Sequence, residues 1–184
     1  MNPFRSAALA AILLVSAPSL AFAHNGLMHS GCPTGQSFTA GDITVTGAYT
    51  RAMLPNAGAA GGYLTIANAG TAADTLTGGA SLAADQIGVH QMKMNGDVME
   101  MSEVEGGLEI PAGGTVALAP SGYHLMFTGI DTPFKEGECV EVTLHFAKAG
   151  DLPIELNIGG IAQDEPVMDH DMDDMSEMSE MSHQ

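Results

Sequence analysis

Polar and apolar residues alternate along several short segments of the chain. The alternation is clearest over residues 138–147, where Val140, Val142, Leu144 and Phe146 share one side and more polar residues fall on the other. The same period of two recurs over residues 43–49, 62–68 and 154–158. Because successive side chains of a strand point to opposite faces, the pattern predicts a half-buried β-strand in each segment.

Turn-forming residues separate these segments, at residues 68–70, 78–79, 111–114, 120–122 and 135–137. No segment has a convincing apolar stripe at the helical period. Short strands between regular turn signals are typical of an antiparallel β-sandwich or barrel, so we predict an all-β fold.

The two ends of the chain differ from this pattern. Residues 1–23 resemble a secretory signal, with Arg5 before an apolar run over 7–15 and a small-x-small cleavage site at 21–23. The apolar run is shorter than the roughly 20 residues of a membrane span, so we expect cleavage, export and no membrane span. A lipoprotein interpretation at Cys32 has no support, because residues 29–31 directly before it do not end an apolar run.

These signals divide the chain into a signal peptide (1–23), an N-terminal arm (24–36), a folded domain (37–162) and a tail (163–184). The tail contains eight Asp and Glu residues, no Lys or Arg, and no aliphatic residue after Val167 other than Met. Such a segment cannot bury a core, so we predict that it is disordered.

Charge excludes several classes of partner. The 184 residues include 22 Asp and Glu but only 5 Lys and Arg, for a formal net charge of −17. Nucleic acids and anionic membrane surfaces require clustered basic residues, so we expect neither as a partner.

The two cysteines, Cys32 and Cys139, lie far apart in the sequence. In an exported protein the oxidising compartment favours a disulfide, which would tie the N-terminal arm to the domain. The alternative is that the thiols bind a metal.

Methionine is unusually frequent, with 13 residues. Asn95-Gly96 is a strong signal for a two-residue type I′ turn, and this turn predicts Met92 opposite Met99 and His90 opposite Met101. These residues, together with Met94, would share one face of a hairpin. His124 and Met126 have the same one-face spacing on a later strand.

Thioether sulfur is a soft ligand that selects Cu(I), and imidazole also suits copper. Several thioethers and two imidazoles in two same-face sets therefore favour a copper site. The alternative is that these methionines are adaptable core residues.

Three segments closely resemble the PCuAC family of periplasmic copper chaperones: residues 90–101, 110–114 and 122–126. The family pattern is a His, ten residues, a Met, and later a His-x-Met pair. Twenty-two residues separate Met101 from His124 here, one more than usual in the family, and we assign the extra residue to the Gly106-Gly107 turn.

The resemblance implies a cupredoxin-like Greek-key β-sandwich or barrel with His90, Met101, His124 and Met126 as Cu(I) ligands. It also implies a periplasmic metallochaperone, not an enzyme, which delivers copper for assembly of the CuA site of cytochrome oxidase. The acceptor would be an oxidase subunit or a Sco-type thioredoxin-fold protein. We expect a monomer.

The tail has its own candidate ligands, which are His170, Met172, Met175, Met178, Met181 and His183. Repeated thioethers can bind Cu(I), and the imidazoles with the carboxylates can bind Cu(II). We therefore predict a second metal site there. The alternative is that the acidic tail only increases solubility.

Two other functions use similar residues. Copper sequestration for tolerance would use the tail as a store. An electron-transfer cupredoxin needs a Cys thiolate, two His and an axial Met, but five residues separate Cys139 from His145 and no Met follows closely. The sequence also contains no nucleophile-elbow or zinc-protease motif.

Overall fold

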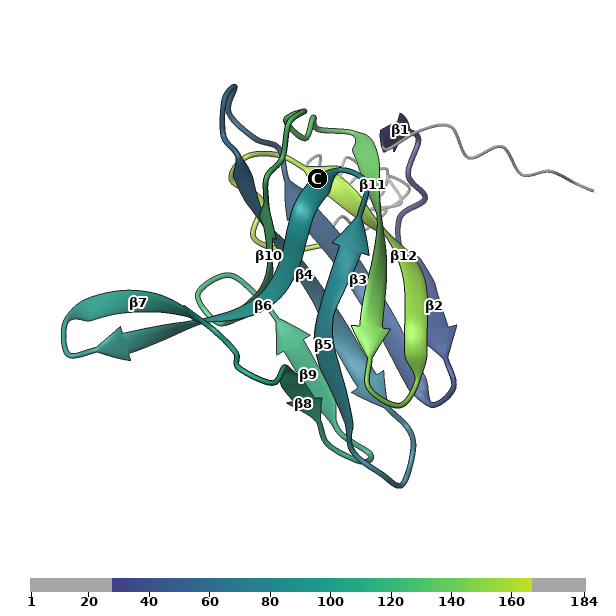
Figure 1. Ribbon diagram of the computed structural model, residues 1–184. Coiled ribbons are helices and arrows are strands. Elements are labelled where there is room, and N and C mark those ends of the chain that lie inside the picture. The colour runs from purple at the N-terminus through teal and green to yellow at the C-terminus, as the bar shows by residue number, and fades with distance from the viewer. Residues whose placement is uncertain (1–27, 167–184) are drawn as a thin grey trace, which may run out of the picture.

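The computed structural model describes residues 28–166, and all regular secondary structure in this range is β-strand. The twelve strands are β1 (Met28–Ser30), β2 (Ser37–Ala40), β3 (Ile43–Arg51), β4 (Ala59–Asn68), β5 (Asp74–Ser81), β6 (Ala84–Asn95), β7 (Val98–Glu103), β8 (Leu108–Ile110), β9 (Thr115–Leu118), β10 (Tyr123–Thr128), β11 (Glu138–Phe146) and β12 (Gly150–Gly159) (Figure 1).

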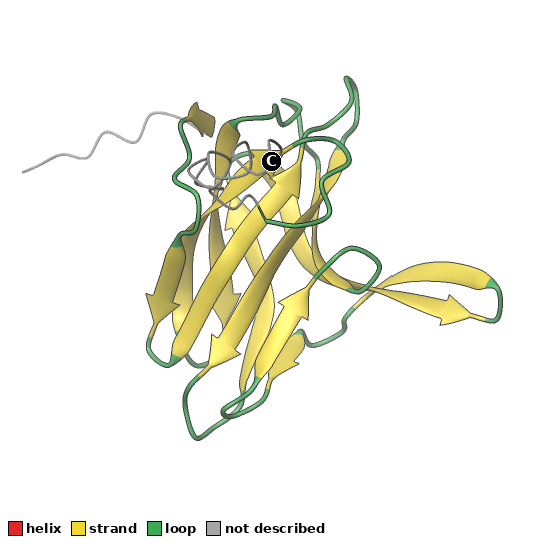
Figure 2. Ribbon diagram, turned by 180° about the vertical axis from the view of Figure 1, so that it is seen from behind, coloured by secondary structure: helices red, strands yellow, loops and turns green. Residues whose placement is uncertain are grey.

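Seven of these strands close into a barrel in the order β11-β12-β3-β4-β10-β6-β5, with β5 pairing back to β11. Neighbouring strands are antiparallel except β12 and β3, which are parallel. The remaining strands each add to one barrel strand, and β7 pairs with β6 alone among the described strands. The predicted all-β fold is confirmed, in its barrel form (Figure 2).

The core follows the alternation seen in the sequence. Val140, Val142, Leu144 and Phe146 of β11 are all buried and belong to one hydrophobic cluster inside the barrel. Burial of these apolar side chains removes them from water, which is the main force that holds such a barrel closed. The cluster therefore fixes which face of each barrel strand points outward.

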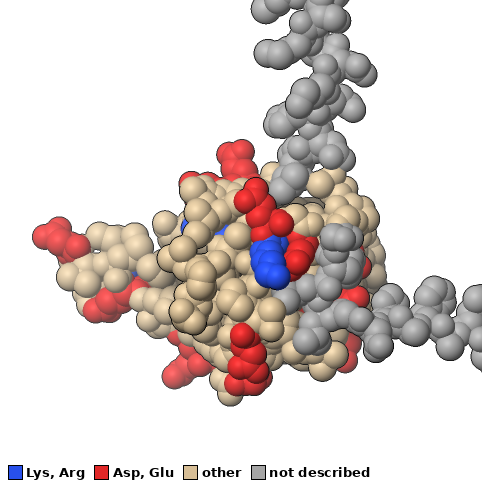
Figure 3. Space-filling view, turned by 90° about the horizontal axis from the view of Figure 1, so that it is seen from above, with Lys and Arg blue, Asp and Glu red and all other residues tan. Residues whose placement is uncertain are grey.

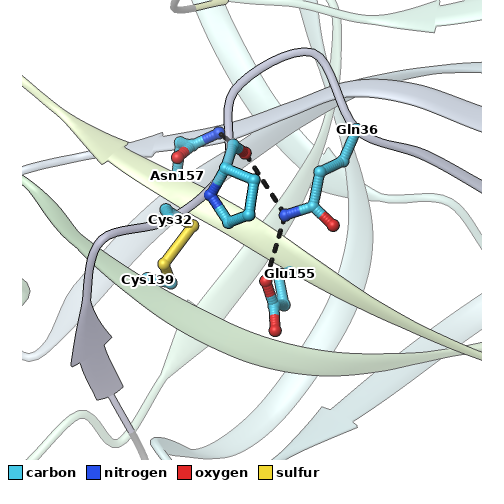
Figure 4. The surroundings of a disulfide bond; sticks show 6 residues. Cys32, Gln36, Cys139, Glu155 and Asn157 are labelled. Carbon is cyan, nitrogen blue, oxygen red and sulfur yellow. Dashed lines mark hydrogen bonds between the residues drawn. A yellow bond between two sulfur atoms is a disulfide. The ribbon is translucent and has the colours of Figure 1, made fainter.

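The N-terminal arm is fastened to the outside of the barrel (Figure 4). A disulfide joins Cys32 to Cys139 on β11, with 5.5 Å between their Cα atoms. Gln36 Nε2 donates a hydrogen bond to Glu155 Oε2 at 3.0 Å. The Pro33 carbonyl accepts hydrogen bonds from Gln36 Nε2 at 3.2 Å and from Asn157 Nδ2 at 3.5 Å. Covalent and polar contacts thus hold the arm across β11 and β12.

The last described residues contact β3. Arg51 Nε donates to the Gln163 carbonyl at 2.6 Å, and Arg51 also forms an ion pair with Asp164. Tyr49 Oη donates to the Asp164 carbonyl at 2.7 Å, and burial raises the pKa of the Tyr49 hydroxyl. The Arg51 guanidinium also lies 5.5 Å from the centre of the Tyr63 ring. The first residues of the predicted tail therefore lie against the barrel.

The predicted signal peptide and the six candidate ligands of the tail lie outside the described residues. Within residues 28–166 there is no helix long and apolar enough to cross a membrane.

Candidate metal site

Strand β6 carries His90 of the candidate site and passes through two environments. Its first half lies in the barrel wall, where Ile87 and Val89 are buried in the core. Its second half leaves the wall and pairs with β7 in a hairpin that projects from the barrel (Figures 1 and 2). Every residue of β7 is exposed. His90 lies where the wall ends and the hairpin begins.

The hairpin forms, but the predicted turn and pairing are wrong. The loop is Gly96-Asp97, and Asn95 pairs with Val98. Gly96 has φ 64°, whereas Asp97 does not have positive φ. A type I′ turn needs positive φ at both central residues, while a type II′ turn needs it only at the first, where glycine is favoured. The Gly-Asp turn thus replaces the predicted Asn-Gly turn.

The new turn shifts the pairing by two residues. Met101 lies opposite Met92, Met99 lies opposite Met94, and Glu103 lies opposite His90. Because side chains alternate along a strand, a shift of two leaves each of them on its predicted face. Met101 is therefore the diagonal neighbour of His90 instead of its direct partner, at a spacing that long side chains can bridge.

Two histidines from adjacent strands meet beside this hairpin. His124 of β10 lies directly opposite His90 of β6, and their ring centroids are 6.0 Å apart. His124 is 7% exposed, whereas His90 is half-buried. Met126 follows two positions after His124, so it lies on the same outer face. The structure therefore gathers His90, His124 and Met126, with Met101 on the neighbouring hairpin arm.

Two glycines flank Met126 on the neighbouring strands. Gly88 of β6 lies opposite Met126 on one side, and Gly61 of β4 lies opposite it on the other. A Cβ atom at Gly88 would lie 3.4 Å from His90 Nε2 and 3.7 Å from Glu103 Oε1. A side chain at position 88 would thus contact the His90 ring. Sequence reasoning missed Gly88 as a part of the site, although glycine inside a strand often marks a close approach.

Hydrogen bonding presets one imidazole for metal binding. His124 Nδ1 lies 3.2 Å from the Gly122 carbonyl oxygen. A carbonyl oxygen can only accept, so Nδ1 is the donor in this bond, and in the neutral ring Nε2 then keeps its lone pair. A backbone carbonyl plays this same part for many metal-bound histidines.

The other imidazole has an unmet bonding capacity. His90 Nδ1 is buried and has no hydrogen-bond partner among the described residues. Such unpaired buried atoms are rare and need a cause. Together with the thioethers of Met101 and Met126, the two imidazoles would supply soft, uncharged donors of the kind that suits Cu(I). The residues present therefore fit a copper ion.

A second group of potential ligands lies at the arm. The ligand atoms of Cys32, Cys139 and Glu155 all lie within 4.8 Å of one another. The two sulfurs are bonded to each other, and a thiolate is the form of cysteine that binds metals. In the oxidised protein this group is a covalent fastening of the arm.

Residues 43–158 match the family described as putative lipoprotein LpqE-like. The chain belongs to the LpqE-like family. A protein named putative lipoprotein Lxx21020, from Leifsonia xyli subsp. xyli (strain CTCB07), is 31% identical over 93 residues, which cover 50% of this chain and 56% of that protein. In this LpqE-like protein Cys32 is bonded to Cys139.

Solved structures share the fold of this LpqE-like protein. The copper-bound PCuAC domain from PmoF2 superimposes with a TM-score of 0.58 at 24% identity, covering 68% of this chain and 98% of that domain. The apo DR1885 structure from Deinococcus radiodurans gives a TM-score of 0.51 at 23% identity, covering 83% of this chain and 97% of that one. The resemblance to PCuAC domains is confirmed for the fold.

Proposed function

We propose that the protein is an exported Cu(I) metallochaperone with His90, Met101, His124 and Met126 as its ligands. The observation that carries the proposal is the His90–His124 pair, whose ring centroids are 6.0 Å apart beside Met126. One ring is oriented by the Gly122 carbonyl and the other has an unpaired buried nitrogen. The similar fold named copper-bound PCuAC domain supports the same conclusion.

The exposure of the ligands suits transfer of copper. His124 is nearly buried, whereas Met101 is 49% exposed on the hairpin arm. A ligand that solvent can reach is also one that the donor group of another protein can replace. We therefore infer that Cu(I) is the cargo, that His124 anchors it, and that Met101 is the first ligand exchanged with an acceptor.

Export and destination complete the proposal. The signal-like residues 1–23 and the Cys32–Cys139 disulfide both favour the periplasm. We propose that a monomer delivers copper for the CuA site of cytochrome oxidase, through an oxidase subunit or a Sco-type thioredoxin-fold protein. The resemblance to PCuAC chaperones supports this destination.

Cu(I) titration against a competing chelator tests the ligand set. We expect His90→Ala and Met101→Ala each to lose the tightest site. The matched control is His145→Ala, because His145 is a surface residue whose Nδ1 lies 2.7 Å from Asp151 Oδ1. Retention of the tightest site in both His90→Ala and Met101→Ala would refute the assignment.

We also propose a weaker second site in the tail, with Cu(I) on Met172, Met175, Met178 and Met181 and Cu(II) on His170 and His183. Repeated soft ligands among carboxylates support it. The test is a chain ending at Pro166, which keeps the Arg51–Asp164 ion pair and removes all six ligands. We expect lower copper stoichiometry, and an unchanged stoichiometry would exclude the tail site.

The second candidate function is sequestration, and the abundance of tail ligands favours it. A sequestering protein would hold several copper ions and pass none to an acceptor. Measuring copper transfer to a purified oxidase CuA domain separates the two functions, because only a chaperone loses its copper to that domain.

A further inference from the structure

The projecting hairpin exposes a row of methionines that the four-ligand site does not use. Met94 is 61% exposed and Met99 is 48% exposed. They lie directly opposite each other, one step outward from the Met92–Met101 pair. No residue between 90 and 103 belongs to the hydrophobic core cluster. The usual role of methionine as adaptable core filler therefore does not explain these side chains.

Their pairing places sulfur atoms within reach of a shared ion. Directly opposed residues of an antiparallel pair have Cβ atoms about 4.5–5.5 Å apart. Asn95 and Val98 flank the two-residue loop, and the pair next to a loop-closing hydrogen-bonded pair is the more closely spaced type. Met94–Met99 is that next pair, and Met92–Met101 is of the same type. Each pair can bring two flexible thioethers onto one soft cation.

The charges on the hairpin favour a cation at its tip. Lys93 and Glu100 lie opposite each other on the other face, and Asn95 Nδ2 donates to Glu100 Oε1 at 3.2 Å. The methionine face therefore carries no basic residue, while Asp97 occupies the loop and Glu103 lies beside His90. Figure 3 shows acidic side chains gathered on the projecting end of the molecule.

We propose that Met94 and Met99 form an outer Cu(I) site, and that Met92 and Met101 connect it to the His90–His124 site. The inference rests on the proposed copper function and extends it to the route of the ion. Cu(I) moves by ligand exchange, in which a bond to a Met94 or Met99 sulfur breaks as a bond to a Met92 or Met101 sulfur forms. Copper remains Cu(I), and no proton is released because a thioether carries none.

Methionine methyl NMR of the full chain tests binding, with Ag(I) as a diamagnetic probe for Cu(I). Single Met→Leu variants assign the methyl signals, so tail methionines are distinguished from those of the hairpin. In a His90→Ala/His124→Ala variant, we expect Ag(I) still to shift the Met94 and Met99 methyl signals. Unchanged Met94 and Met99 signals at excess Ag(I) would overturn the outer site.

Stopped-flow transfer of Cu(I) from its bicinchoninate complex tests the route. Met94→Leu/Met99→Leu keeps apolar volume and removes both sulfurs. We expect loading of the inner site to slow about tenfold, with the equilibrium affinity of that site unchanged. Glu100→Gln is the control on the opposite face, and we expect it to load at nearly the wild-type rate.

The outcomes separate this inference from the proposed function. If Met94→Leu/Met99→Leu loads as fast as wild type while His90→Ala loses the tight site, the outer route is wrong and the copper function stands. If His90→Ala also keeps the tight site, the proposed function itself is wrong.

Discussion

The barrel and the β6–β7 hairpin share one continuous strand but differ in what their side chains contact. On the barrel half of β6, Ile87 and Val89 are buried among the core residues. On the hairpin half, Met94 faces solvent, as does the whole of β7. Stability should therefore depend on the barrel and metal exchange on the hairpin, so substitutions can separate the two.

The largest effect is expected in the core. Phe127 is fully buried and packs edge-on against Phe134, with 5.8 Å between ring centroids. Phe127→Ala should lower the free energy of unfolding by about 3–5 kcal/mol, because it loses apolar burial and leaves a cavity. Urea denaturation measures the change. A loss below about 1 kcal/mol would show that the barrel interior does not determine stability.

The disulfide should have the next largest effect. Replacing Cys32 and Cys139 together by Ala removes a cross-link over 107 positions of sequence separation. The free energy of unfolding should fall by roughly 2–5 kcal/mol, since the unfolded chain gains freedom. Denaturation of the wild type with and without a reductant gives the matched comparison. The prediction would be contradicted if the wild type had the same free energy of unfolding with and without the reductant.

Asp74 should make stability depend on pH. Burial alone would raise the pKa of the Asp74 carboxyl, but hydrogen bonds from the amides of Ala149, Thr75 and Lys148, with the Lys148 charge, outweigh it and lower the pKa. The carboxylate accepts these bonds at 2.7–2.9 Å. A lowered folded-state pKa contributes stability above the unfolded pKa of about 3.9, and this contribution is lost as pH falls through the folded value.

Asp74→Asn should therefore cost about 2 kcal/mol at pH 7, because charge-assisted bonds become neutral ones. The difference from wild type should shrink as pH falls below about 4. Urea denaturation at several pH values measures it. An equal difference at every pH would show that the Asp74 charge does not stabilise the fold.

The smallest effect on stability is expected at the hairpin. Met99→Ala removes an exposed side chain, so the free energy of unfolding should change by no more than about 0.5 kcal/mol. The same urea experiment used for Phe127→Ala measures it. A loss greater than about 1 kcal/mol would mean that the hairpin packs as part of the core.

The difference between the two regions also explains what the sequence could predict. Alternation over 138–147 predicted the buried face of β11 because one face of that strand meets the core. The hairpin buries neither face of β7, and register is weakly specified where no face is buried. The hydrophobic pattern therefore could not show whether the turn lies at Asn95-Gly96 or at Gly96-Asp97. For this reason the predicted pairing of His90 with Met101 was wrong.

The neighbourhood of His90 and His124 needed the structure. These residues lie on β6 and β10, which pair with each other although β7, β8 and β9 lie between them in the chain. Local periodicity places each residue on a face of its own strand but does not identify the strand beside it. For the same reason Gly61 of β4 could not be placed next to Met126 from the sequence.

The edge of β7 that is unpaired among the described strands has a consequence for how copies of the protein meet. Because β7 pairs with β6 alone among the described strands, one side of its backbone can accept a strand from another molecule, which is a common route to aggregation. Asp97, Glu100 and Glu103 are all exposed along this hairpin. Two hairpins approaching edge to edge would bring like charges together. The acids of this hairpin, of which Asp97 and Glu103 also favour a cation, therefore keep neighbouring molecules apart.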